Sequence, residues 1–142
     1  MIVIVWNDKF AINVEQVDEQ HRTLFELTRA LYDIVKTESA EKQTIEGALD
    51  ALVDYTAYHF KSEEALMREI DYPRYESHKL EHDTLTAQAL DFRTQLLDGK
   101  PVDTEEFLNF LFNWLTKHIM DKDKKIGAYI ELQDLKVRET EG

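Results

Sequence analysis

Two pairs of potential metal ligands lie within one short stretch of this 142-residue chain. His59 and Glu63 are four residues apart, and so are His78 and His82. Side chains at this spacing lie on one face of a helix, one turn above the other. Between the two pairs, Tyr72-Pro73 predicts a turn. The stretch therefore predicts two antiparallel helices that aim both pairs into a shared interior.

The remaining histidines fall on the predicted inner faces of the other helices, and two carboxylates join them. A single histidine on an apolar face is more often a hydrogen-bonded core residue than a ligand. A whole set is different, because each buried polar group without a partner costs about 1–3 kcal/mol. A metal would satisfy all of them together. The candidate ligands are His21, His59, Glu63, His78, His82, His118 and Asp123.

Seven ligands exceed one coordination shell, so the set predicts two ions, with the carboxylates bridging and the histidines terminal. Paired iron suits this mixture of imidazole and carboxylate and adds redox chemistry. The chain has no Glu-x-x-His, the motif of ferritin-like di-iron proteins. A site rich in neutral imidazole stabilises high-valent iron less well, which favours binding of oxygen over its activation.

The hydrophobic pattern predicts four helices, at about 18–38, 41–69, 73–98 and 103–126. An irregular arm over 1–17 precedes them, a polar tail over 128–142 follows, and Gly127 is expected to end or bend the fourth helix. Short connections predict one domain over 1–142, an all-α, up-down-up-down antiparallel four-helix bundle. The five-residue step from His118 to Asp123 is about 140° off one helical face, which predicts a π-bulge there.

Composition excludes several classes of function. The chain has 17 Lys and Arg against 29 Asp and Glu, a net charge of −12, which argues against binding to nucleic acid or to an anionic membrane. The absence of cysteine excludes disulfides, iron–sulfur clusters and thiolate zinc sites. The apolar run at the start is too short for a signal peptide, and no run has membrane-spanning length, so a cytoplasmic location is expected.

The ligand spacing resembles the signature of the hemerythrin family over roughly residues 6–130. The matching elements are His59-x3-Glu63, His78-x3-His82 and His118-x4-Asp123, with His21 upstream. The segments VDEQHRTLF and WLTKHIMDKDKKIG resemble prokaryotic members in particular.

This resemblance implies a non-haem di-iron centre with named roles for the ligands. Glu63, Asp123 and an oxo or hydroxo group would bridge the two irons. One iron would take His78, His82 and His118; the other would take His21 and His59 and keep one position open. Oxygen would bind there as a hydroperoxide and leave reversibly.

Three apolar residues surround His118 on the predicted fourth helix: Trp114, Leu115 and Ile119. In the family, the position of Leu115 lies near the oxygen pocket, and an apolar lining would slow oxidation to the inactive diferric state. Ordinary core packing is an equal alternative for Trp114 and Ile119.

Reversible oxygen binding, for carriage, storage or delivery, is the function that the resemblance implies, with no enzymatic activity. The alternatives are an oxygen or redox sensor and a di-iron enzyme acting on peroxide or nitric oxide. No acid–base group is evident beyond the ligands, which disfavours the enzyme. Molecular oxygen is the expected binding partner, a monomer is sufficient for a bundle of this size, and no protein partner is indicated.

Overall fold

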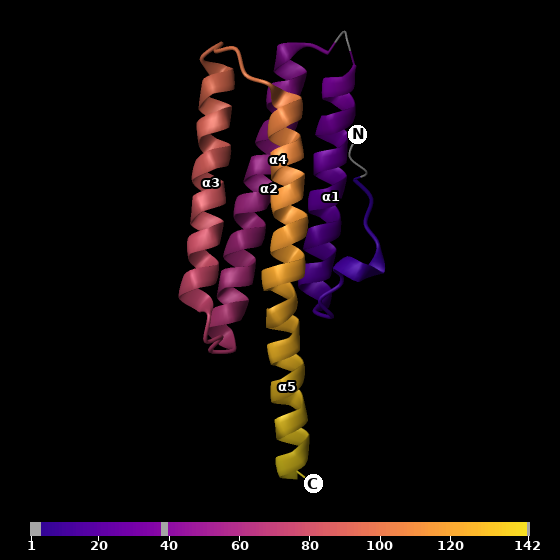
Figure 1. Cartoon of the computed structure of the whole chain (residues 1–142), viewed down its shortest axis with the longest axis vertical. Coiled ribbons are helices and arrows are strands. Elements are labelled where there is room, and N and C mark those ends of the chain that lie inside the picture. The colour runs from indigo at the N-terminus through magenta and orange to yellow at the C-terminus, as the bar shows by residue number, and fades with distance from the viewer. Residues whose placement is uncertain (1–3, 38–39, 142) are drawn as a thin grey trace.

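Four long helices run alternately up and down around a shared interior in the computed structural model, which describes residues 4–37 and 40–141 (Figure 1). No strand occurs in those two ranges. The prediction of an all-α four-helix bundle with an irregular N-terminal arm is confirmed. The elements are η1 (Asp8–Phe10), α1 (Glu15–Lys36), α2 (Lys42–Glu69), α3 (Tyr75–Leu97), α4 (Thr104–His118), the π-helix η2 (Ile119–Asp123) and α5 (Lys124–Glu141).

The turn between α2 and α3 returns the chain so that both ligand pairs face inward. Asp71 adopts a positive φ of 52°, the left-handed conformation that commonly ends a helix. The Tyr72 N–H donates to the Met67 carbonyl at 2.9 Å, which closes the last turn of α2. The predicted break at Tyr72-Pro73 therefore lies where the structure reverses direction.

The first helix begins at Glu15, three residues before the predicted start at residue 18. Asp18 was expected to begin the helix, but in the structure it lies within the first turn and binds the arm. Its buried carboxylate accepts hydrogen bonds from the backbone N–H groups of Ile12, at 2.8 Å, and Asn13, at 3.2 Å. Asp18 thus fastens the arm to the first turn of α1.

The prediction that a fourth helix ends at residue 126 and leaves a polar tail over 128–142 is wrong. α5 runs through Gly127 to Glu141 and projects beyond the other helices (Figure 1). Gly127 neither ends nor breaks it. A Cβ atom at this position would lie 2.0 Å from the carbonyl oxygen of Ile12. The glycine therefore allows the arm to cross the helix, and the Lys, Ala, Glu and Leu residues of this segment favour helix.

The apolar core has two parts. The larger runs the length of the bundle and includes the fully buried Leu31, Leu49 and Leu108. The smaller consists of Met67, Tyr72 and Ile126, where α5 passes the turn between α2 and α3. Within the described ranges, no helix is both long and apolar enough to cross a membrane.

Candidate metal centre

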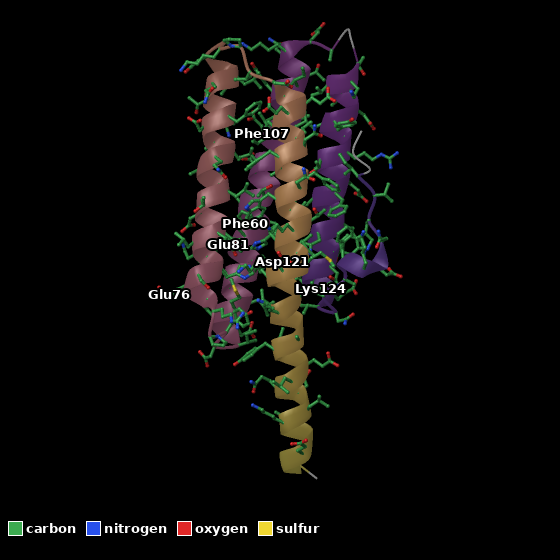
Figure 2. The ribbon with its side chains drawn as sticks, in the orientation of Figure 1. Phe60, Glu76, Glu81, Phe107, Asp121 and Lys124 are labelled. Atoms are coloured by element: carbon green, nitrogen blue, oxygen red, sulfur yellow. The ribbon has the colours of Figure 1, made fainter. Side chains whose placement is uncertain are left out.

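The structure brings all seven predicted ligands together in the half of the bundle that contains the α2–α3 turn. All seven side chains are buried. They come from every helix of the bundle: α1 supplies one, α2 and α3 supply two each, α4 supplies His118 and η2 supplies Asp123. In Figure 2, the labels of Phe60 and Glu81 mark the level of this cluster, and Phe107 marks the apolar half above it. The ligand residues form two groups that share Glu63 and Asp123.

The first group contains three histidines. The Nε2 atoms of His78 and His82 lie 2.6 Å and 3.2 Å from Glu63 Oε1. The Nε2 atoms of His78 and His118 each lie 3.1 Å from Asp123 Oδ1. One oxygen of each carboxylate therefore faces the three-histidine group.

The second group contains His21 and His59. His21 Nε2 lies 3.0 Å from Asp123 Oδ2, and His59 Nε2 lies 3.4 Å from Glu63 Oε2. Each carboxylate thus divides its two oxygens between the two groups. This division is what two bridging carboxylates require.

The arrangement of the donor atoms suits binding to a pair of metal ions better than hydrogen bonding among the side chains themselves. Both ring nitrogens of His21, Glu63 Oε2 and both oxygens of Asp123 are buried without a hydrogen-bond partner, although several lie close together. His118 Nε2 lies 3.1 Å from His78 Nε2 and 3.3 Å from His82 Nε2. Ring nitrogens bound about 2.1 Å from one ion at right angles would be about 3 Å apart. The arrangement therefore suits a metal at the centre of each group.

A comparison with known families agrees with this geometry. Residues 13–130 match the family model described as the hemerythrin HHE cation binding domain. The chain belongs to the hemerythrin family. Membership brings a di-iron centre, and the resemblance inferred from the ligand spacing is confirmed.

Individual relatives cover nearly the whole chain. A bacteriohemerythrin of Methylococcus capsulatus is 34% identical over 128 residues, which cover 89% of this chain and 96% of the relative. A bacteriohemerythrin of Clostridium acetobutylicum is 30% identical over 126 residues, covering 87% and 98%. A crystal structure of wild-type hemerythrin superposes with a TM-score of 0.84 at 34% identity, covering 89% of this chain and 97% of that one.

The five-residue step between His118 and Asp123 is accommodated by the π-helix Ile119–Asp123. The predicted π-bulge is therefore confirmed. The wider turn brings Asp123 back to the face that carries His118, so one continuous helical column supplies both side chains. In a regular α-helix, His118 and Asp123 could not face the same point.

Burial and ion pairing shift the pKa values of three of these groups in the iron-free chain. Burial alone would raise the pKa of Glu63, but the imidazoles of His59, His78 and His82, at 3.4, 2.6 and 3.2 Å from its carboxylate oxygens, hold it well below its ordinary range. Burial would likewise raise the pKa of Asp123, but the charge of the neighbouring His118 and its contact with the carboxylate lower this pKa well below its ordinary range. Burial lowers the pKa of His78, yet the bonds to Asp123 and Glu63 raise it to about 9.

Sequence reasoning missed the side chains that hold the ligands from outside. The Nδ1–H of His59 donates to Gln20 Oε1 at 2.7 Å, and that of His82 donates to Glu64 Oε2 at 2.9 Å. Both partners are adjacent in sequence to a predicted ligand, His21 or Glu63, and both are buried. A buried polar residue beside a ligand was the signal that could have identified them.

The three apolar residues near His118 occupy different surroundings. Trp114 stacks on the His118 ring, with centroids 4.5 Å apart and an interplanar angle of 11°, so it covers the three-histidine group. Leu115 and Ile119 are buried in the main core. Their role in lining an oxygen pocket is a proposal.

Proposed function

We propose that this chain binds molecular oxygen reversibly at a pair of iron ions held by His21, His59, Glu63, His78, His82, His118 and Asp123. The observation that carries the proposal is the division of the Glu63 and Asp123 oxygens between two histidine groups of unequal size.

The unequal groups define where oxygen would bind. The three-histidine group offers five ligand atoms, and the two-histidine group offers four. A solvent-derived oxo or hydroxo bridge would add one ligand to each, which fills an octahedral shell on the first side and leaves one position open on the second. Two ferrous ions would supply the electrons that reversible oxygen binding requires.

The protein's own part is to keep this position dry and its ligands fixed. Leu115 and Ile119 are 5% and 0% exposed, and we propose that they line the oxygen pocket. Apolar walls slow the entry of water and protons, which would otherwise promote loss of the oxygen in reduced form, as hydrogen peroxide, and leave both irons ferric. Trp114 would act on the three-histidine group, by restricting rotation of the His118 ring on which it stacks.

Binding rather than enzymatic turnover is the expected activity. All five histidines of the chain belong to the two groups, so none remains as a separate acid or base for peroxide or nitric oxide chemistry. A cytoplasmic location and a monomeric state remain predictions from the sequence.

The test is anaerobic loading with ferrous iron, followed by cycles of oxygen exposure and removal, with iron analysis and visible absorption. We expect two irons per chain and an absorption band that appears with oxygen and disappears when oxygen is removed. Immediate irreversible oxidation would contradict a carrier and favour the sensor or the enzyme. Fewer than two irons per chain would contradict the site itself.

Two variants in the same π-helix segment provide a matched comparison. Asp123→Asn removes the charge of a proposed bridge, and we expect loss of at least one iron. Asp121→Asn removes an exposed carboxylate two residues earlier, and we expect two irons and a normal band. Equal loss in both variants would show that the effect is not specific to the bridge.

A further inference from the structure

The two halves of the centre are supported from outside by chemically different partners. His82, in the three-histidine group, donates from Nδ1 to the Glu64 carboxylate at 2.9 Å. His59, in the two-histidine group, donates from Nδ1 to the Gln20 side-chain amide oxygen at 2.7 Å. One partner is an anion and the other is neutral.

The neutral partner is held in one orientation. Gln20 Nε2 donates to Ser62 Oγ at 3.0 Å, and Gln20 Oε1 faces His59 Nδ1 at 2.7 Å. An amide oxygen only accepts, and therefore the Nδ1 atom of His59 carries the proton. Nε2 is thereby left with its lone pair toward the centre, the form that binds a metal.

The charged partner is equally well fixed. Glu64 is only 8% exposed, and its bond to His82 is of the charge-assisted kind. The ring of Phe60 stacks on His82 with centroids 3.9 Å apart and an interplanar angle of 4°, which restricts rotation of the imidazole. A carboxylate that accepts from a ligand histidine raises the basicity of the ring, and hence its strength as a donor.

Within residues 4–37 and 40–141, no such anion lies behind either ring of the two-histidine group. The second member, His21, is fully buried, and its Nδ1 atom has no hydrogen-bond partner. Its outward neighbour is Trp6 of the arm, with ring centroids 6.5 Å apart. The side chains that contact the outer faces of His21 and His59, Trp6 and Gln20, are therefore both neutral.

We propose that Glu64 and Gln20 are positioning residues that make the two iron positions electronically unequal; this inference rests on the proposed function. Glu64 strengthens His82 as a donor to the iron with the full shell. Gln20 fixes His59 without adding charge, so the iron with the open position stays electron-poor. That iron then retains its ferrous state between oxygen cycles and resists irreversible oxidation.

The test exchanges the partners in the full-length, iron-loaded protein. Glu64→Gln keeps an acceptor but removes its charge, and we expect iron binding at the three-histidine position to weaken 10- to 100-fold. Gln20→Glu places an anion behind His59, and we expect oxidation to the diferric form to be faster than in the wild type, because the carboxylate strengthens the ring as a donor. Mössbauer spectra of the diferrous protein should show two distinct iron environments. Glu64→Gln should shift the signal of the iron in the three-histidine group, and Gln20→Glu that of the iron in the two-histidine group.

Matched controls lie on the same helices. Glu69→Gln removes an exposed carboxylate from α2. Gln16→Glu adds a carboxylate one turn before Gln20, at an exposed residue that also donates to Ser62 Oγ, at 3.2 Å, but does not contact His59. Both should leave iron affinity, spectra and oxidation rate unchanged. If either matches its test variant, general charge and not the hydrogen bond is responsible, and the inference fails.

A readout without iron separates this inference from the proposed function. In the full-length chain loaded with zinc as a redox-silent probe, ¹⁵N NMR of the imidazole rings should report Nδ1–H on both His59 and His82. Glu64→Ala should alter the signals of His82 alone, and Gln20→Ala those of His59 alone. Unchanged ring signals, or unchanged iron environments in the exchanged variants, would overturn the inference while two irons and reversible oxygen binding remain. Failure of the wild type to bind two irons would instead overturn the proposed function, and the inference with it.

Discussion

The two ends of the bundle interior are filled with opposite kinds of side chain. Fully buried leucines such as Leu31, Leu49 and Leu108 belong to one apolar cluster, in the parts of α1, α2 and α4 that lie near the α1–α2 and α3–α4 connections. Toward the α2–α3 turn, the same four helices enclose five imidazoles and two carboxylates, several of whose atoms lack a hydrogen-bond partner. Burial of apolar surface stabilises the first end by itself. The second end buries polar groups at a cost, so its stability depends on what those groups bind.

Removal of the metal should therefore have the largest effect, and only on the polar end. A ligand present at a thousand times its dissociation constant adds about 4 kcal/mol to the free energy of unfolding. We expect a chelator to lower the melting temperature substantially. Amide hydrogen exchange should accelerate around His59 and His118 more than around Leu49 and Leu108. Calorimetry and exchange on the loaded and stripped protein would measure both.

A cavity in the apolar end serves as the control for that experiment. Leu108→Ala should cost about 2–5 kcal/mol, because the leucine is fully buried and the space it leaves is not refilled. The loss should be the same with and without iron, since Leu108 has no part in the site. A loss that depends on iron would show that the two ends do not act independently.

The response of the iron-free chain to pH should be the next largest effect. The pKa of His78 is raised to about 9 by its bonds to Asp123 and Glu63, against about 6.5 in an unfolded chain. The folded state thus holds this proton more tightly, and the stabilisation is complete below about pH 6.5. It is lost as the pH rises through 9, by about 3 kcal/mol. Urea unfolding of the iron-free protein across this range would measure the loss.

The same titration distinguishes the two ends. His78→Gln in the iron-free chain should remove the decline between pH 6.5 and 9, whereas Leu108→Ala should lower stability at every pH and leave the slope intact. Iron affinity should increase over this range, because a metal must displace the His78 proton. A decline that survives in His78→Gln would assign the titration to another group.

The polar end was the more predictable one from the sequence, because ligand chemistry constrains both residue type and spacing. The pairs His59–Glu63 and His78–His82 placed two helices, and the step from His118 to Asp123 predicted a π-bulge that the structure contains. Contacts between distant segments left no such signal. Gln20 and Glu64 acquire their roles only when α1, α2 and α3 pack, and neither has a distinctive spacing from the ring that it supports.

Gly127 shows the same limit at a single residue. A glycine after a helical stretch ordinarily marks a helix end. Here the determining contact is with Ile12, more than a hundred positions earlier, and local sequence carries no trace of it. The predicted helix end failed because a tertiary contact, and not the local conformation, explains the glycine.

The two glycines inside helices give the smallest predicted effects, and they have opposite signs. Gly47→Ala should stabilise by about 1 kcal/mol, because no atom lies within 4 Å of the added Cβ and alanine favours helix. Gly127→Ala should instead destabilise by about 1–3 kcal/mol, because its Cβ would clash with the backbone of Ile12 and displace the arm. Asp18 holds that part of the arm on α1, and Trp6 of the arm lies against His21. Gly127→Ala should therefore also accelerate oxidation of the loaded centre, while Gly47→Ala, at the apolar end, should not. If Gly127→Ala were stabilising and left oxidation unchanged, the arm would have no part in closing the polar end.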